Sequence, residues 1–209
     1  MTARIAGLYA VTPDVADTDV LSRKVAAALA GGAQVVQYRN KTGSAALRRE
    51  QASRLHALCR QHGVPLVIND DVALALALGA EGLHLGMDDG PVADARARIG
   101  ERMMLGISCY DSLARAQAAV DEGADYVAFG AAFPSRVKPD AVRASVELYS
   151  RARARYRVPI VAIGGITLEN APALIAAGVD AIAVISALFD APDIEQAASS
   201  FTALFSRPV

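Results

Sequence analysis

The chain has 209 residues, with 21 Lys and Arg against 22 Asp and Glu, and its formal net charge is −1. That charge argues against general nucleic-acid binding, which normally requires a basic stripe or patch. The absence of Trp argues against a platform on which bases stack. A hydrophobic content of 53% instead indicates a large buried core, in which parallel strands can be covered on both faces.

The sequence does not indicate a secreted protein or a membrane protein. Met1–Ile5 lacks the long apolar segment of a secretory signal, and no apolar run approaches the roughly 20 residues that span a bilayer. Cys59 and Cys109 lack metal-ligand spacing, so we expect two reduced thiols. We therefore expect a cytoplasmic protein that binds neither a membrane nor nucleic acid.

Short apolar runs alternate along the chain with helical segments. The expected strands are Ile5–Val11, Ala33–Tyr38, Leu66–Asn69, Gly82–Leu85, Met103–Ser108, Asp125–Phe129, Pro159–Ile163 and Asp180–Ile185. The expected helices are Asp19–Ala30, Ser44–His62, Val72–Leu78, Val92–Ile99, Ser112–Glu122, Ala141–Tyr156, Leu168–Ala177 and Ile194–Phe205. Eight strands alternating with eight helices predict an α/β fold, a closed (β/α)₈ TIM barrel, as a single domain over residues 1–209.

Glycines support the same rhythm, because a glycine lets a helix reverse tightly into the next strand. They precede expected strands at Gly31–Gly32, Gly79, Gly123 and Gly178. A doubly wound open sheet is the alternative architecture, and it would normally have a Gly-rich phosphate turn after its first strand. Thr12–Asp14 is not such a turn, which favours the barrel.

Reactive side chains follow the second expected strand. Gln37, Arg39 and Lys41 alternate in phase at its end. Arginine can grip phosphate oxygens with a planar fork, and lysine acts as a movable point charge. The residues therefore suggest an anion site at the carboxyl-terminal rim of the barrel, with an ordinary solvated loop as the alternative.

Carboxylates follow the next two strands. Asn69–Asp70 ends the third strand, and Asp89 follows the fourth. Two carboxylates from adjacent strand ends can share Mg²⁺, which usually takes one or two protein carboxylates plus waters and substrate phosphates. The alternative is helix capping, by Asp70 or Asp71 before one helix and by Asp88 or Asp89 before the next.

Other polar residues have simpler interpretations. His84 lies inside a short apolar strand, where a lone histidine is more often a hydrogen-bonded structural group than an acid or base. Ser108 and Ser135 have no suitably placed base, so we expect phosphate hydrogen-bond donors and not nucleophiles. Lys138 lies in the longest loop, which fits an active-site lid, or else a plain surface loop.

The last two strands end in a different kind of sequence. Gly164–Gly165 follows the seventh strand and Ile185–Ser186 the eighth. Barrels often bind phosphate between the loops after these two strands, where backbone amides and a helix N-terminus can cradle the anion. We expect a second phosphate site here.

Taken together, these motifs resemble those of the thiamine-phosphate synthase family over nearly the whole chain. The matching segments are Gln37-x-Arg39-x-Lys41, Asn69–Asp70, His84–Leu85–Gly86-x-x-Asp89, Gly106-x-Ser108, Pro134–Ser135-x-x-Lys138, Ile163–Gly164–Gly165–Ile166 and Val184–Ile185–Ser186. The resemblance implies a (β/α)₈ barrel that uses Mg²⁺. It also implies that the barrel joins hydroxymethylpyrimidine diphosphate to a thiazole phosphate and releases pyrophosphate.

The resemblance also implies roles for individual residues. The pyrimidine-diphosphate grip would comprise Gln37, Arg39, Lys41, Asn69, Ser108 and Lys138, with Ser135 at a position where the family usually has threonine. Asp70 and Asp89 would bind magnesium, and the thiazole phosphate would contact Gly165, Ile185 and Ser186. The chain departs from the family pattern at Met87, Ala131 and Val137, which usually hold a glutamine, a proline and a hydroxyl residue. These departures bear on affinity more than on reaction type.

The implied mechanism is dissociative. Mg²⁺, Arg39, Lys41 and Lys138 would stabilise the departing pyrophosphate, and the electron-rich pyrimidine would delocalise the cation left behind. A thiazole tautomerase on the same fold is one alternative, although it needs no diphosphate or magnesium site. A non-catalytic binder of phosphorylated thiamine precursors is another. The sequence leaves open whether the chain forms a homodimer.

Overall fold

The computed structural model describes residues 5–86, 88–134 and 142–206. Its strands are β1 (Gly7–Val11), β2 (Val35–Tyr38), β3 (Leu66–Asn69), β4 (Gly82–Leu85), β5 (Met104–Tyr110), β6 (Tyr126–Phe129), β7 (Ile160–Ile163) and β8 (Ala181–Val184). Its helices are α1 (Thr18–Ala30), α2 (Ala45–Gln61), α3 (Val72–Leu78), α4 (Val92–Ile99), α5 (Leu113–Asp121), α6 (Val146–Arg155), α7 (Ala171–Ala176), α8 (Ser186–Phe189) and α9 (Ile194–Ala203).

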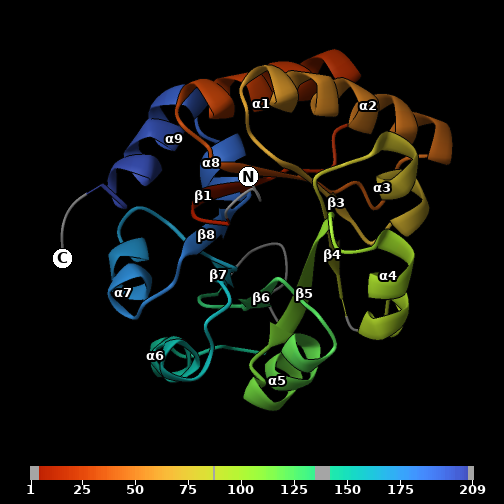
Figure 1. Cartoon of the computed structure of the whole chain (residues 1–209). Coiled ribbons are helices and arrows are strands. Elements are labelled where there is room, and N and C mark those ends of the chain that lie inside the picture. The colour runs from red at the N-terminus through yellow and green to blue at the C-terminus, as the bar shows by residue number, and fades with distance from the viewer. Residues whose placement is uncertain (1–4, 87, 135–141, 207–209) are drawn as a thin grey trace.

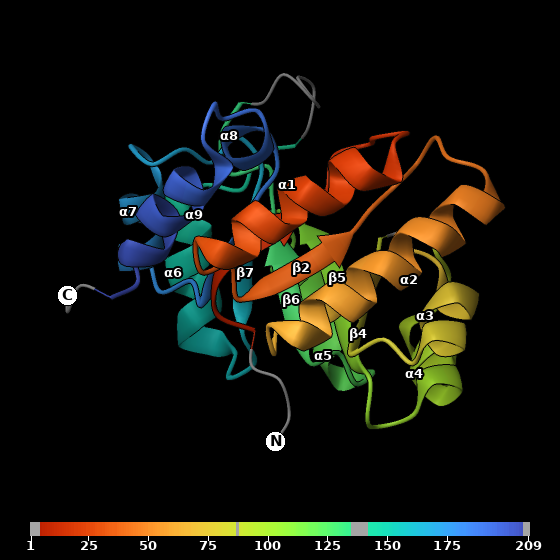
Figure 2. The ribbon, with the colours of Figure 1, turned by 90° about the horizontal axis from the view of Figure 1, so that it is seen from above.

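The strands form one closed parallel sheet. Each strand pairs with the next in chain order, and β1 also pairs with β8. Figure 1 looks along the barrel from the end where the strands begin, with the helices around the outside. Figure 2 turns the molecule so that the strands run upward toward their carboxyl ends. The predicted (β/α)₈ barrel is confirmed, and the open-sheet alternative is wrong.

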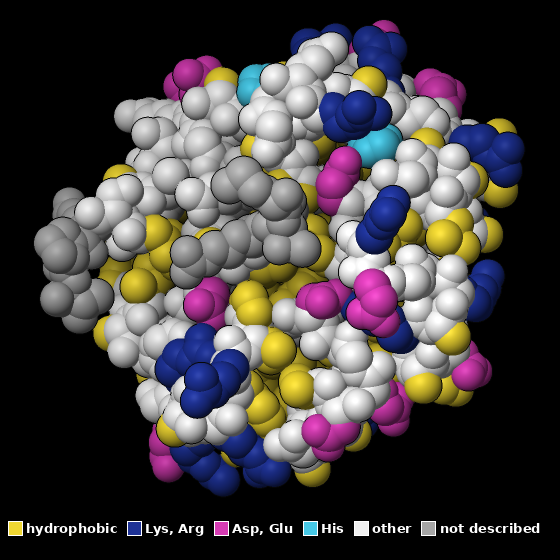
Figure 3. Space-filling view, in the orientation of Figure 1, with side chains coloured by type: hydrophobic (Ala, Val, Ile, Leu, Met, Phe, Trp, Pro, Cys, Tyr) yellow, Lys and Arg dark blue, Asp and Glu magenta, His cyan; other side chains and the backbone are white. Residues whose placement is uncertain are grey.

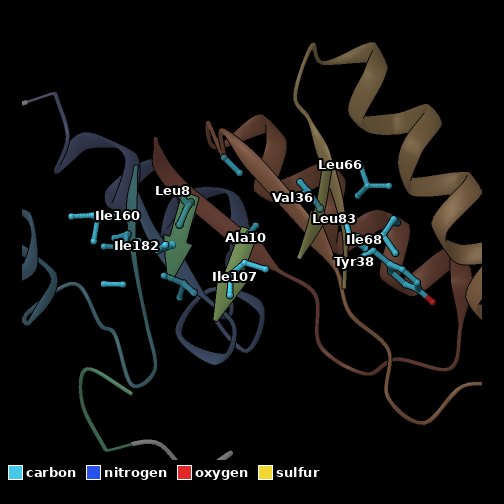
Figure 4. Packing of buried hydrophobic residues seen from close by; sticks show 14 of the residues in the cluster. Leu8, Ala10, Val36, Tyr38, Leu66, Ile68, Leu83, Ile107, Ile160 and Ile182 are labelled. Atoms are coloured by element: carbon cyan, nitrogen blue, oxygen red, sulfur yellow. The ribbon is translucent and has the colours of Figure 1, made fainter. Parts of the chain in front are cut away.

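Alternate residues of each strand pack into two different layers. Outward side chains such as Leu8, Ile68 and Ile182 pack between the sheet and the helices in the larger hydrophobic cluster (Figure 4). Inward side chains such as Tyr9 and Val67 form a smaller cluster that fills the barrel. Because side chains on a strand alternate with a period of two, residues in phase with the inward set emerge at the mouth of the barrel.

Most expected boundaries agree with the structure to within a few residues, with two larger differences. The helix expected from Ala141 begins at Val146, because Ser145 caps it by accepting a hydrogen bond from the Leu148 N–H at 3.3 Å. The short helix α8 was not predicted, because four residues are too few to show a helical period. Its last carbonyl, of Phe189, accepts a hydrogen bond from Lys24 Nζ at 2.5 Å.

The end of the barrel where the strands begin is held by carboxylates placed just before strands. Asp125 Oδ2 accepts the Leu105 N–H at 2.7 Å and pairs with Arg96 at 2.5 Å. Glu81 and Asp180 make the same kind of contact to neighbouring strands. On this face, Lys and Arg side chains lie mostly toward the edge, and hydrophobic side chains are visible near the centre with acidic ones beside them (Figure 3). These contacts tie adjacent strands together, which is a structural role.

The remaining global predictions concern the cysteines and membrane segments. Cys59 and Cys109 are both buried and unpaired, as expected from the sequence. Within the described ranges, no helix is both long enough and apolar enough to cross a membrane.

Candidate active site

The carboxyl ends of the strands surround a cavity of about 340 Å³. The predicted site residues that line it are Gln37, Arg39, Lys41, Asn69, Asp70, Asp89, Ser108 and Ile185. These residues come from five different strand ends, so the barrel brings together side chains that are far apart in the sequence. Their assigned roles remain predictions.

A second cavity, of about 450 Å³, lies beside the first. Gly165, Ile185 and Ser186, the predicted thiazole-phosphate contacts, all line it. Its wall includes residues that also line the first cavity, namely Ile163, Gly164, Ala183 and Ile185. Ser135 and Lys138 lie outside the described residues, as do Met87 and Val137.

Residues in the loop after β1 hold the backbone at the end of β2 in place. Thr12 Oγ1 donates to the Arg39 carbonyl at 3.0 Å and accepts the Arg39 N–H at 2.9 Å. Asp14 accepts the Lys41 N–H at 2.7 Å and lies 3.5 Å from Arg39 Nη1. Arg39 and Lys41 are thus held on the cavity side, in phase with Gln37. These contacts fix the backbone of the segment, and the anion-binding role of its side chains stays a prediction.

The contacts at the end of β3 show which of its two aspartates caps the following helix. Asp71 caps α3 by accepting the Leu74 N–H at 2.9 Å. Asp70 instead lines the cavity and accepts a hydrogen bond from Lys41 Nζ at 2.7 Å. Its φ of +64° is rare for a residue with a side chain, and such conformations concentrate at functional sites. One aspartate is therefore a helix cap, and its neighbour belongs to the cavity.

Asp89 lies on the same side of the cavity and does not cap α4, whose N-cap residue is Pro91. Its Oδ2 accepts the Gly86 N–H at 2.6 Å. Desolvation raises the pKa of the Asp89 carboxyl, the Gly86 N–H opposes this, and the nearby Asp70 carboxylate adds to the rise. The Asp70 carboxylate is close enough to disfavour the charge on Asp89, a repulsion that a shared cation would remove.

A series of hydrogen-bonded polar side chains crosses the barrel interior, and its members also line this cavity. Gln37 Nε2 donates to Tyr9 Oη at 2.8 Å, and Tyr9 Oη lies 2.9 Å from Tyr126 Oη. Tyr126 Oη lies 3.0 Å from His84 Nδ1, and His84 Nε2 lies 2.9 Å from Ser108 Oγ. His84 is therefore a hydrogen-bonded group, as its position in an apolar strand indicated. The expectation that Ser108 has no nearby base is wrong, because strand pairing of β4 with β5 brings His84 Nε2 to 2.9 Å from Ser108 Oγ.

Burial determines the protonation states of the side chains in this hydrogen-bonded series. It lowers the pKa of His84 to about 4, although the Asp70 carboxylate acts in the opposite direction. It raises the pKa of the Tyr9 and Tyr126 hydroxyls. At neutral pH the imidazole is neutral and both tyrosines keep their protons.

The ends of β7 and β8 offer backbone in place of charged side chains. Gly165 has a φ of +63°, and a Cβ there would lie 2.4 Å from the Pro134 carbonyl oxygen. Asn170 Nδ2 donates to the Gly165 carbonyl at 3.0 Å and so holds this turn. Ser186 begins α8 at the edge of the second cavity. A glycine is required at position 165 because of both its conformation and its close approach to the loop after β6.

Several residues of the site were not singled out from the sequence. Tyr9 and Tyr126 count as hydrophobic residues when the alternation of a strand is assessed. Both side chains face into the barrel, and their hydroxyls take part in the hydrogen-bonded series. Asp14 braces β2 from a different loop, and Tyr110 lines the cavity with a φ of +54°. The inward phase of β1 and β6 was the available signal for the two buried tyrosines.

Ala131 is one departure from the family pattern that the structure describes. Its N–H donates to the Val142 carbonyl at 2.9 Å, and its carbonyl accepts the Ala144 N–H at 3.0 Å. Proline has no N–H and could not make the first of these bonds. The alanine thus ties the loop after β6 to the segment that leads into α6.

A closed parallel barrel whose charged cavity lies at the carboxyl ends of its strands defines the class of a (β/α)₈-barrel enzyme. Residues 8–188 match a family model described as thiamine monophosphate synthase. The chain belongs to this family, whose members are transferases of thiamine biosynthesis.

Individual relatives agree with the family match. The chain is 54% identical over 200 residues to the thiamine-phosphate synthase of Thiobacillus denitrificans, covering 96% of this chain and 95% of the relative. It is 55% identical over 202 residues to that of Methylobacillus flagellatus, covering 97% and 96%. A solved thiamine phosphate pyrophosphorylase from Pyrococcus furiosus superposes with a TM-score of 0.87 at 33% identity, covering 96% of each chain.

Proposed function

We propose that this chain is a Mg²⁺-dependent thiamine-phosphate synthase. It would transfer the 4-amino-2-methyl-5-pyrimidinylmethyl group from its diphosphate to 4-methyl-5-(2-phosphoethyl)thiazole, giving thiamine phosphate and pyrophosphate. The observation that carries this proposal is the pair of adjoining cavities with a common wall at one rim. A reaction between two phosphorylated molecules requires two anion sites whose occupants meet at their reacting ends.

The first cavity suits the pyrimidine diphosphate. Its proposed binding groups are Gln37, Arg39, Lys41, Asn69 and Ser108, together with Ser135 and Lys138 from the motif after β6. Its other wall is apolar and includes Val161, Ile163 and Ala183, which can cover the face of a flat ring. A volume of about 340 Å³ is in the range of small-molecule pockets.

The lining residues fit a divalent cation. Among the described ones, the cations Arg39 and Lys41 face three carboxylates, Asp70, Asp88 and Asp89. A cavity of this charge would not hold a diphosphate without further positive charge. Asp70 and Asp89 are the proposed ligands, since hard oxygen donors are what Mg²⁺ takes. When bound, the ion would neutralise charge on the diphosphate and its leaving group.

The chain's own residues then act by position and charge. Arg39, Lys41 and Lys138 would stabilise the negative charge that grows on the departing pyrophosphate. The pyrimidine delocalises the cation left on its methylene carbon, and the thiazole nitrogen attacks that carbon from the adjoining cavity. The carbon–oxygen bond breaks with its electron pair on pyrophosphate, so the step requires no enzyme nucleophile or strong base.

The second cavity suits the thiazole phosphate. The glycine turn at Gly164–Gly165 and the start of α8 at Ser186 line it, so backbone and hydroxyl groups are available to phosphate oxygens. Asp190 also lines this cavity. Ile185 lines both cavities and would contact both substrates where they meet.

A two-substrate assay tests the proposal. Pyrophosphate release should require the pyrimidine diphosphate, the thiazole phosphate and Mg²⁺ together, and thiamine phosphate should form in equal amount. Binding of both precursors without turnover would instead identify a non-catalytic binder. Isomerisation of a thiazole phosphate alone, without metal, would identify a tautomerase.

A further inference from the structure

The hydrogen-bonded series that crosses the barrel interior has a definite direction, which follows from counting its protons. The Tyr9 hydroxyl oxygen accepts from Gln37 Nε2, so its own proton requires another acceptor. Among the described residues, that acceptor is Tyr126 Oη at 2.9 Å. No buried side-chain polar atom in the described part of the chain lacks a partner. Tyr9 therefore donates to Tyr126.

The donor and acceptor of each remaining hydrogen bond then follow in order. Tyr126 has used its oxygen as an acceptor, and its proton points to His84 Nδ1 at 3.0 Å. Nδ1 is then an acceptor without a proton, so the ring proton of the neutral imidazole lies on Nε2. Nε2–H donates to Ser108 Oγ at 2.9 Å.

We propose that this one-way series holds His84 as the Nε2–H tautomer and leaves the Ser108 proton free to donate into the cavity. Ser108 lines that cavity, and within the described ranges no protein acceptor takes its proton. The ligand atom that docks against Ser108 is then a hydrogen-bond acceptor. Tyr126 and His84 are positioning residues, which act through Ser108. That the ligand is the pyrimidine diphosphate rests on the proposed function, whereas the tautomer does not.

Neighbouring residues hold the Tyr126 ring in one position. A Cβ at Gly106 would lie 1.9 Å from Tyr126 Cζ, so only glycine on β5 leaves room for this ring. The ring stacks on the His84 imidazole, with centroids 5.6 Å apart and an interplanar angle of 29°. Tyr126 is fully buried, and among the described residues its hydroxyl contacts Tyr9 Oη and His84 Nδ1. This packing explains the glycine in the Gly106-x-Ser108 motif.

Nitrogen NMR of ¹⁵N-histidine-labelled protein without substrate tests the tautomer directly. The expected spectrum shows a pyrrole-type Nε2 and a pyridine-type Nδ1 for His84, assigned by loss of the signal in His84→Gln. A protonated Nδ1 would overturn the proposal, because it would mean that the whole series runs in the opposite direction, with Gln37 turned over. This result would leave the transferase activity standing, and an inactive wild-type protein would leave the tautomer standing.

A pair of tyrosine variants sharpens the test. Tyr126→Phe removes the donor to Nδ1, so both tautomers should appear, and kcat should fall about tenfold. Tyr149→Phe is the matched control. Its hydroxyl is equally buried but donates to the Phe129 carbonyl outside the cavity, so tautomer and kcat should stay as in the wild type. A single Nε2–H tautomer with wild-type kcat in Tyr126→Phe would also overturn the proposal.

Discussion

The two halves of the barrel mouth present anion-binding groups of different kinds. At the ends of β2, β3 and β4, charged side chains from different strands face one another, as in the Lys41–Asp70 pair at 2.7 Å. At the ends of β7 and β8, a glycine turn and the start of a short helix line the cavity. The first half depends on charge and the second on backbone conformation. Substitutions should therefore affect them in different ways.

The charged half is also the half that requires a counter-ion. Its carboxylates outnumber its cations among the described lining residues, and the pKa of Asp89 is raised by desolvation and by the neighbouring Asp70. The backbone half has Asp190 as its charged lining residue in the described part of the chain. We therefore expect metal dependence to come from the first half, and selectivity for the second substrate to come from the other.

Removal of a proposed metal ligand should have the largest effect. Asp89→Ala should lower Mg²⁺-dependent turnover about a thousandfold, because the ion that offsets diphosphate charge loses one of two carboxylates. The side chain is exposed, so the fold should survive, and the thermal unfolding midpoint should change little. The measurement is pyrophosphate release across a magnesium titration.

Asp88→Ala is the matched control for this substitution. It removes an exposed carboxylate from the same cavity edge but not one of the proposed ligands, so its loss of turnover should be far smaller. Wild-type activity in Asp89→Ala would remove Asp89 from the metal site. Equal losses in both variants would show that the cavity responds to total charge and not to a specific pair.

The sequence was sufficient for the fold and for the charged half of the mouth. Strand and helix periods predicted the barrel, and the alternation of Gln37, Arg39 and Lys41 already had the inward phase seen in the structure. It was not sufficient for the hydrogen-bonded series through Tyr9 and Tyr126, since two residues 117 apart meet only after the barrel closes. The role of Asp71 rather than Asp70 as a helix cap likewise depends on backbone angles that spacing does not reveal.

Acid should destabilise the interior beneath the charged half. The pKa of His84 is lowered from 6.5 to about 4 by burial, against the opposing effect of Asp70. The unfolded chain therefore binds more protons than the folded one between these values. The stabilisation is complete above about pH 6.5 and is lost as the pH falls toward 4, by up to about 1.4 kcal/mol per pH unit.

Urea unfolding of the wild type and of His84→Gln from pH 7 to pH 5 measures this contribution. The wild-type free energy of unfolding should fall more steeply than that of the variant, which cannot titrate at this position. Parallel curves would mean that the folded imidazole takes up its proton as readily as the unfolded one. The glycine turns of the backbone half contain no titratable side chain and should not contribute to the difference.

A substitution that strains the glycine turn should act mainly on the second substrate. Gly165→Ala must adopt a φ of +63° and bring its Cβ within 2.4 Å of the Pro134 carbonyl oxygen, so the turn must shift. We expect the KM for the thiazole phosphate to rise about thirtyfold, equivalent to about 2 kcal/mol, with a much smaller change for the diphosphate. Steady-state kinetics with each substrate varied in turn provides the measurement.

Gly63→Ala is the control for backbone strain. Gly63 has a similar φ of +67° but nothing within 4 Å of a Cβ, and it lies between α2 and β3, away from both cavities. It should lower the free energy of unfolding by about 1 kcal/mol and leave both KM values unchanged. If it matched Gly165→Ala in the kinetics, the effect at position 165 would reflect general destabilisation and not the phosphate turn.

The smallest expected effect separates the two halves most directly. Ser186→Ala removes one hydroxyl at the start of α8 and keeps the backbone, so the KM for the thiazole phosphate should rise about tenfold, the value of one hydrogen bond to an anion. The KM for the pyrimidine diphosphate should hardly change, because Ser186 lines the second cavity and not the first. Ser108→Ala should show the opposite pattern. Equal weakening of both substrates by Ser186→Ala would mean that the two cavities act as one anion site, and the distinction between a charged half and a backbone half would be lost.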